Sequence, residues 1–93
     1  MKQLAEMLCS IPRGKVTTYA ALARRLGVHP RTVGVMLNKN AHPVIIPCHR
    51  VVLSSGEIGG YANGVVQKER ILSAEGIEIK KGKIDLEKHF FKF

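Results

Sequence analysis

Hydrophobic residues in the first forty positions recur every three or four residues, which is the period of an α-helix. A first amphipathic helix is predicted over residues 2–10, and Pro12 ends it. A second helix is predicted after Thr17 or Thr18, either of which can cap it, and Gly27 closes it. The apolar side of this second helix consists of Tyr19, Leu22, Ala23 and Leu26.

A third helix is predicted to begin at Arg31, after a short turn over residues 28–30. Its apolar side consists of Val33, Met36 and Leu37, and its outward face of Arg31, Val35 and Asn38. Two helices joined by a short turn form the helix-turn-helix pattern.

The second half of the chain has a different pattern of hydrophobic and polar residues. Residues 44–53 are nearly all apolar, but Pro47 cannot donate to a strand ladder, so an extended segment and a turn are predicted before a strand at residues 50–53. After a turn at residues 54–56, a fourth helix is predicted over residues 65–75. A terminal hairpin turns at residues 80–83.

These elements predict a mainly α fold with small β elements, a winged-helix-like helix-turn-helix domain that occupies residues 1–93 as one unit. Ninety-three residues and 10.3 kDa suffice for one domain, and 45% hydrophobic residues suffice for its core. The formal charge is +8, of which +7 belongs to residues 1–68 (nine basic minus two acidic groups). A basic body with a nearly balanced tail favours a polyanionic partner.

Several classes are not favoured. No apolar run approaches the roughly 18 residues of a membrane span, and the N-terminus does not resemble a signal peptide. The four histidines and two cysteines lack zinc-site spacing, and no phosphate-binding or dinucleotide glycine motif is present, so neither a metal nor a cofactor is predicted. Two cysteines make a poor disulfide framework, which favours a reducing compartment, the cytoplasm or, in a eukaryote, the nucleus.

The two cysteines lie in different settings. Cys9 is predicted to be a small buried hydrophobe on the apolar side of the first helix. Cys48 lies between Pro47 and His49, with Arg50 next, in an otherwise apolar run. His and Arg side chains favour a thiolate, but adjacent side chains in an extended segment point to opposite faces. From spacing alone, Cys48 is either a nucleophile or a core cysteine next to a histidine whose hydrogen bonds are satisfied.

Glu75 falls in the last turn of the fourth predicted helix, where the helix dipole disfavours a carboxylate. Either the Glu75 carboxylate is solvated, or a cationic or hydrogen-bonding partner offsets its unfavourable interaction with the helix dipole.

The run Ile46-Pro47-Cys48-His49-Arg50-Val51-Val52 resembles the O6-alkylguanine-DNA alkyltransferases. The resemblance extends over about residues 3–76, and four other segments carry it: residues 14–19, which include Tyr19, residues 31–34, residues 54–61 and residues 68–76. The additional N-terminal domain that the family commonly carries is absent from this sequence. The resemblance implies irreversible transfer of an alkyl group from O6-alkylguanine, or O4-alkylthymine, in double-stranded DNA to Cys48.

The resemblance also implies a role for each residue. Cys48 attacks the alkyl carbon, His49 takes the thiol proton through water, Glu75 orients His49, Tyr19 donates to the departing guanine and Asn40 braces the turn before Cys48. The flipped base is held by residues near Val51, Tyr61, Ala62 and Asn63. Ala62 stands where many members carry serine, and Asn63 where some carry glycine, so the range of alkyl groups is expected to differ.

DNA contacts are expected from Arg31, Thr32, Val35, Arg24, Lys39 and Arg50. The resemblance implies that Arg31 fills the gap left by the flipped base, although a phosphate contact is the commoner role for arginine at such a helix. The third helix is expected in the minor groove, and the protein is expected to act as a monomer or as a domain of a larger repair protein.

Three competing functions stay open at this point. Alkyltransferase-like damage sensors share the fold and bind alkylguanine, but typically carry tryptophan in place of the cysteine. A helix-turn-helix regulator needs no reactive thiol, which leaves residues 47–50 unexplained. A fused or assembled repair protein can include this domain as one part.

Overall fold

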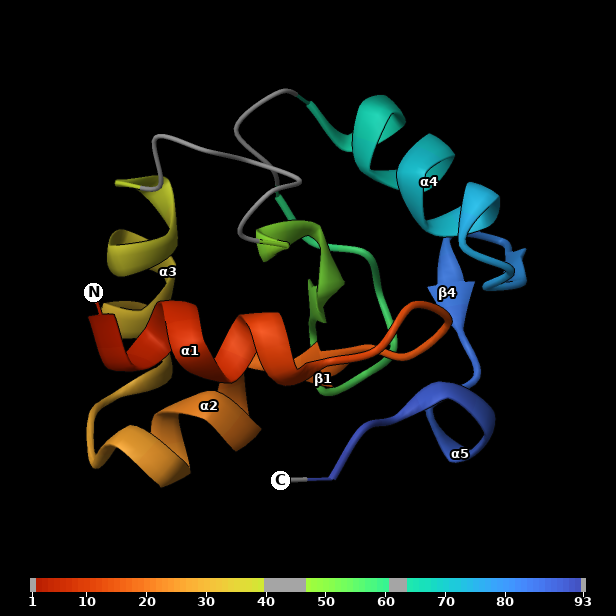
Figure 1. Ribbon diagram of the computed structural model, residues 1–93. Helices are drawn as coiled ribbons and strands as arrows, with labels where there is room; N and C mark the ends of the chain where they lie inside the picture. Colours follow the sequence, from red (N-terminus) through yellow and green to blue (C-terminus); the bar gives the residue numbers. More distant parts are fainter. Residues whose placement is uncertain (1, 40–46, 61–63, 93) are drawn as a thin grey trace.

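Short helices surround two very small sheets in the computed structural model of the protein, which describes residues 2–39, 47–60 and 64–92 (Figure 1). The elements in chain order are α1 (Lys2–Ser10), β1 (Thr17–Thr18), α2 (Tyr19–Leu26), α3 (Pro30–Asn38), the 3-10 turn η1 (Cys48–Arg50), β2 (Val51–Val52), α4 (Val65–Ala74), β3 (Ile79–Lys80), β4 (Lys83–Ile84) and α5 (Leu86–His89). The predicted mainly α fold with small β elements is confirmed.

The helix-turn-helix pair α2 and α3 forms as the capping residues predict. Thr18 accepts a hydrogen bond from the Ala21 amide at 3.1 Å and so begins α2, and Gly27 ends it in the left-handed conformation (φ 71°). α3 begins one residue earlier than predicted, at Pro30, because proline suits the first turn of a helix. The side chain of His29 caps α3 by accepting from the Arg31 amide at 3.0 Å.

A parallel pairing between β1 and β2 joins the two halves of the chain. Thr17 is aligned with Val51 and Thr18 with Val52. The strand predicted over residues 50–53 is shorter than expected, because residues 48–50 form the turn η1. The pairing itself was not predicted, since two-residue strands carry no periodic signal.

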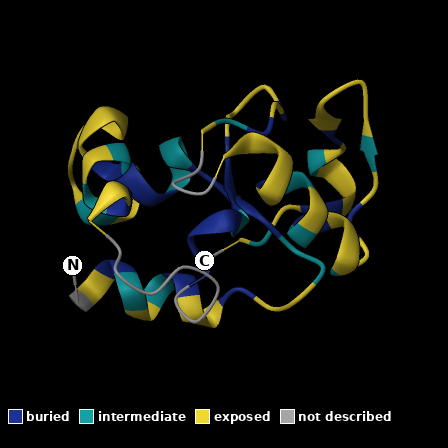
Figure 2. Ribbon diagram, turned by 90° about the horizontal axis from the view of Figure 1, so that it is seen from above, coloured by how far each residue is buried: buried dark blue, intermediate teal, exposed yellow. Residues whose placement is uncertain are grey.

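Two hydrophobic clusters lie on opposite faces of this small sheet. The first contains Leu4, Leu8, Ile11, Leu22, Ala23, Val33, Leu37, Cys48 and Val51, and the second contains Val16, Val52, Ile58, Leu72, Ile77 and Ile84. Val51 and Val52 belong to different clusters because successive side chains of a strand point to opposite faces. Buried residues accordingly gather around the centre, with exposed helix faces outside (Figure 2).

The prediction that Cys9 is buried is wrong. Cys9 is exposed, whereas Leu4 and Leu8 of the same helix are fully buried. Cys9 follows Leu8 directly, and consecutive residues of a helix are turned by about 100° from each other, so the buried stripe leaves Cys9 outside.

The terminal hairpin is confirmed. Ile79 is aligned with Ile84 and Lys80 with Lys83, and Lys81 (φ 52°) and Gly82 (φ 75°) make the turn in the left-handed region. α5 was not predicted, because four residues are too few for a periodic signal. None of the described helices is long and apolar enough to cross a membrane.

Candidate active site around Cys48

The pairing of β1 with β2 brings two distant segments of the chain together. β2 follows Cys48-His49-Arg50 directly, and β1 precedes Tyr19, the first residue of α2. Helix α4 packs against η1 and supplies Lys68 and Glu75 from its two ends. Segments that are far apart in the sequence therefore come together around the turn that carries Cys48.

Cys48 is buried, with 6% of its surface exposed, and begins the turn η1. Pro47 before it sets the turn, whose Arg50 amide donates to the Pro47 carbonyl at 3.1 Å. The Cys48 side chain lies close enough to Tyr19 and Lys68 to act electrostatically on both. The thiol therefore has a phenol on one element and a cation on another as neighbours.

The carboxylate of Glu75 joins His49 and Arg50. His49 Nε2 lies 3.0 Å from Glu75 Oε2, and Arg50 donates to the same carboxylate through Nε (2.9 Å) and Nη2 (2.6 Å). Arg50 Nη1 also donates to the Ile11 carbonyl at 2.8 Å, after the end of α1. The structure thus supplies both a cationic and a hydrogen-bonding partner at the end of α4, where the helix dipole alone disfavours the carboxylate.

This network fixes which nitrogen of His49 is free. A carboxylate only accepts, so His49 Nε2 carries the hydrogen and the neutral ring keeps its lone pair on Nδ1. Within the described residues, Nδ1 is buried and has no hydrogen-bond partner. Burial lowers the pKa of His49, and the Arg50 and Lys68 charges add to this against the opposing effect of Glu75. His49 is therefore neutral at pH 7 and able to accept a proton at Nδ1.

Glu75 is held in its charged form. Burial alone would raise the pKa of this carboxyl, but the hydrogen bonds from Arg50 and His49, with their charges, lower it below its ordinary value. A charged carboxylate at 3.0 Å stabilises a protonated His49. Glu75 therefore both orients the His49 ring and carries the charge that pairs with Arg50.

Lys68 is a site residue that sequence reasoning missed. It is fully buried in α4, and its Nζ donates to the Val51 carbonyl at 2.7 Å and to the Gly60 carbonyl at 3.1 Å. Burial lowers its pKa to about 8, and the nearby Cys48 opposes this shift. No signal in the sequence separates this lysine from Glu69, which is half-buried, or Arg70, which is exposed, on the same helix.

Tyr19 is half-buried and lies near Cys48. Burial, and then the nearby Cys48, raise its pKa, so the hydroxyl keeps its proton at neutral pH. Its ring also packs beside Gly59, whose left-handed backbone (φ 77°) follows β2. Tyr19 lines a cleft of about 360 Å³ with Pro30, Arg31, Gly34 and Leu53, so the phenol and the start of α3 face one cavity.

Most of the predicted DNA-binding residues lie on the surface. Arg24, Arg31, Thr32, Val35 and Lys39 are exposed, on or next to α2 and α3. Arg50 does not join them, because its guanidinium binds Glu75 and the Ile11 carbonyl and its side chain is only 15% exposed.

The family model described as 6-O-methylguanine DNA methyltransferase, DNA binding domain, matches residues 1–77. The chain belongs to this family. The methylated-DNA–protein-cysteine methyltransferase of Methanothermobacter thermautotrophicus is 42% identical over 79 residues, 85% of this chain and 45% of that protein. A bifunctional methyltransferase/endonuclease of Picrophilus torridus is 44% identical over 90 residues, 95% of this chain and 30% of that protein. The chain therefore spans less than half the length of these relatives.

A solved structure of similar size is S. pombe Atl1 in complex with damaged DNA containing O6-carboxymethylguanine. It is 29% identical, with a TM-score of 0.87, and the likeness covers 99% of this chain and 94% of Atl1. The sequence thus matches the methyltransferase family over residues 1–77. The structure resembles that of a DNA-bound protein over nearly the whole chain.

Some residues that the resemblance to the methyltransferase family selects lie outside the described part of the chain. These are Asn40, Tyr61, Ala62 and Asn63. Val51, the remaining predicted pocket residue, is fully buried, and its carbonyl accepts from Lys68.

Proposed function

We propose that the protein repairs double-stranded DNA by transferring the alkyl group of O6-alkylguanine to Cys48, once per molecule. The observation that carries the proposal is the set of ionisable groups around Cys48. Tyr19 and Lys68 lie near it, and the adjacent His49 is neutral, with an Nδ1 that has no hydrogen-bond partner among the described residues. A core cysteine needs no such set of ionisable neighbours, whereas an activated nucleophile does.

The transfer is a single displacement. Cys48 gives its proton through a water molecule to His49 Nδ1, and Glu75 stabilises the resulting imidazolium. The sulfur then bonds to the alkyl carbon as the bond between that carbon and O6 breaks, and the electron pair of this bond stays on the guanine. Tyr19 donates a proton to the departing base, and solvent returns one to Tyr19.

Lys68 favours the same step through its charge. Its ammonium lies near Cys48, so it places a positive charge beside the sulfur that bonds to the alkyl carbon. The product is a thioether, which has no easy reverse reaction, so each chain acts once.

Reaching O6 in a duplex requires that the base leave the stack, because the atom is otherwise covered. α3 lies in the minor groove in this proposal, with Arg31 in the gap left by the flipped base. The shared cleft of Tyr19 and Arg31 supports this, since it places the start of α3 beside the phenol that meets the base. Arg24 and Lys39 contact phosphates, so affinity falls as salt rises.

The further details are proposals of the same kind. Val51, Tyr61, Ala62 and Asn63 surround the base, Asn40 braces the turn before Cys48, and O4-alkylthymine is a further substrate. The large part of the curated relatives that this chain does not span supports the view that it can act as one domain of a larger repair protein.

A second candidate function is damage binding without transfer. The likeness to S. pombe Atl1 over nearly the whole of both chains favours it. The cysteine at position 48, where non-reactive members typically carry tryptophan, and the free His49 Nδ1 beside it favour transfer.

Two variants of the same length separate these functions. Cys48→Ser and Cys9→Ser are each incubated with a duplex that contains one O6-methylguanine, and the loss of the methyl group from DNA is measured by nucleoside chromatography. Transfer predicts full loss with Cys9→Ser and none with Cys48→Ser, which still binds the duplex. Binding without loss of the methyl group in the unmodified protein establishes the second function instead.

A further inference from the structure

The last part of the chain, residues 86–92, returns to the middle of the molecule after the family match has ended at residue 77. It consists of α5 and a short extended run, here called the C-terminal strap. In Figure 1 the strap runs from α5 back beneath β1, toward α2. The likeness to S. pombe Atl1 covers 99% of this chain, and the match to the Picrophilus torridus relative covers 95% of it.

The strap binds the backbone of Val16, next to β1. The Val16 amide donates to the His89 carbonyl at 2.9 Å, and the Phe91 amide donates to the Val16 carbonyl at 2.7 Å. Together these bonds make a parallel bridge between Val16 and Phe90. Val16 is fully buried, so its two backbone groups depend on the strap for their partners.

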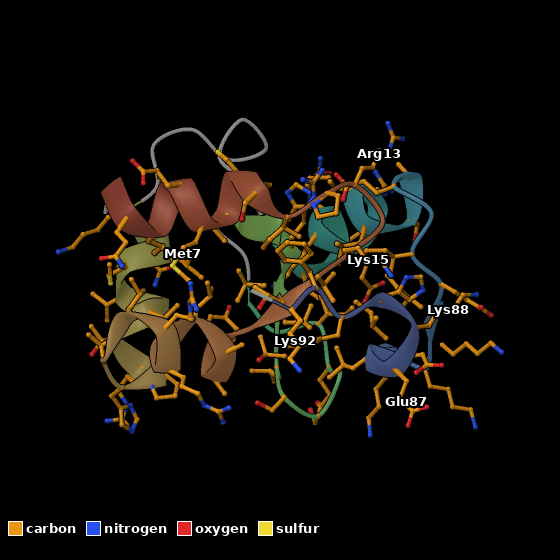
Figure 3. All side chains as sticks on the ribbon, turned by 60° about the horizontal axis from the view of Figure 1, so that its bottom comes forward. Met7, Arg13, Lys15, Glu87, Lys88 and Lys92 are labelled. Atoms are coloured by element: carbon orange, nitrogen blue, oxygen red, sulfur yellow. The ribbon has the colours of Figure 1, made fainter. Side chains whose placement is uncertain are left out.

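Side chains tie the strap to the same segment. His89 is buried, with 6% of its surface exposed, and its Nδ1 donates to the Gly14 carbonyl at 3.1 Å. Lys15 Nζ donates to the Lys88 carbonyl at 3.0 Å, and Figure 3 shows Lys15 over the strap, between α5 and the chain end at Lys92. Phe91 packs against the hydrophobic cluster that contains Cys48.

Residues 14–18 are therefore held from both edges. The strap binds one edge at Val16, and β2, which directly follows the Cys48 turn, binds the other at Thr17 and Thr18. Tyr19 comes next in the chain, and Thr18 caps the helix that it begins. The position of the phenol relative to Cys48 thus depends on a segment that the strap completes.

We propose that the C-terminal strap is a positioning element for transfer, which holds Tyr19 in place against Cys48 through its bonds to residues 14–16. This inference rests on the proposed function and extends it, because it assigns a part in the reaction to residues outside the family match. A displacement of reacting groups by about 1 Å can cost about a hundredfold in rate, so loss of one strap bond has a measurable effect.

The test uses single-residue variants of this chain in single-turnover transfer at saturating duplex. His89→Ala removes the bond to Gly14, and Lys88→Ala is the matched control, because it changes an exposed side chain while its backbone carbonyl remains. We expect His89→Ala to slow the transfer step about tenfold with little change in DNA affinity, and Lys88→Ala to leave both unchanged.

A double-variant cycle with Tyr19→Phe separates positioning from a general loss of structure. If the strap acts through Tyr19, His89→Ala has almost no further effect in the Tyr19→Phe protein. Alkylation of Cys48 by iodoacetamide, which has no guanine to release, also stays at the wild-type rate.

Equal losses from His89→Ala in both backgrounds, or slower alkylation by iodoacetamide, overturn the positioning role and leave only a structural one. A wild-type transfer rate in His89→Ala overturns it as well. Absence of transfer by the wild-type protein overturns the proposed function instead, so the two failures are distinguishable.

Discussion

One carboxylate organises the candidate site at the scale of single residues. Glu75 binds His49 and Arg50 together, and Arg50 extends the network to the Ile11 carbonyl. The site is thereby anchored to the end of α1, to the turn that carries Cys48 and to the end of α4. His49 gains a fixed tautomer from this arrangement, and that tautomer leaves Nδ1 available for a proton.

The lowered pKa of His49 predicts how transfer depends on pH. His49 accepts the thiol proton only while it is neutral. The pKa of His49 lies below its ordinary value of 6.5, so the transfer rate should stay constant around pH 7 and fall as the pH drops through this pKa. Single-turnover rates at saturating DNA between pH 5 and 8 measure this. A fall that begins above pH 7 contradicts the assignment of His49 as the base.

Glu75→Gln is expected to slow transfer about a hundredfold, since general-base assistance is typically worth at least that much. The amide keeps one acceptor but loses the charge that stabilises protonated His49. Loss of the charged pair with Arg50 should also lower the free energy of unfolding by about 2 kcal/mol.

Glu78→Gln is the matched control for Glu75→Gln. Its pair with Lys80 is exposed, with the two side chains 56% and 81% accessible, so neither rate nor stability should change measurably. Similar effects of both substitutions would contradict the special role of Glu75.

At the scale of elements, the sequence predicted what local chemistry determines. The Thr18 cap, Gly27 and the apolar stripe located α2, and Pro47 located the turn before β2. The β1–β2 pairing was missed, because it joins two-residue strands from distant parts of the chain. Lys68 was missed for a related reason, since its burial depends on the carbonyls of Val51 and Gly60, which only tertiary structure brings to it.

Helix α3 carries a prediction of its own. Arg31→Ala should weaken repair of duplex DNA by about tenfold or more and leave reaction with the free base O6-methylguanine nearly unchanged, because only the duplex needs a flipped base to be replaced. Rates with both substrates at one salt concentration measure the difference.

Lys80→Ala controls for the loss of one exposed positive charge elsewhere, on the terminal hairpin. Equal losses on duplex and free base in Arg31→Ala would rule out the assignment of Arg31 to the flipped-base gap.

At the scale of the whole molecule, a buried lysine couples stability to pH. The pKa of Lys68 is lowered from 10.5 to about 8 in the folded protein, so between these values the unfolded chain binds more protons. The contribution of Lys68 to the free energy of unfolding therefore rises from pH 8 toward pH 10.

Urea midpoints of the wild-type protein and of Lys68→Met at pH 8 and pH 9.5 test this coupling. The increase in urea midpoint from pH 8 to pH 9.5 should be larger in the wild-type protein than in Lys68→Met. The same increase in both proteins would contradict the lowered pKa of Lys68.

The central claim is that the buried cysteine reacts and the exposed one does not. Cys9 is the more accessible thiol, so methylation of Cys9 would show the effect of solvent accessibility alone. Peptide mass spectrometry of the wild-type protein after incubation with a duplex that contains O6-methylguanine decides between them. We expect one added methyl group on the peptide that carries Cys48 and none on the peptide that carries Cys9. Methyl groups on both peptides, or on neither, would contradict it.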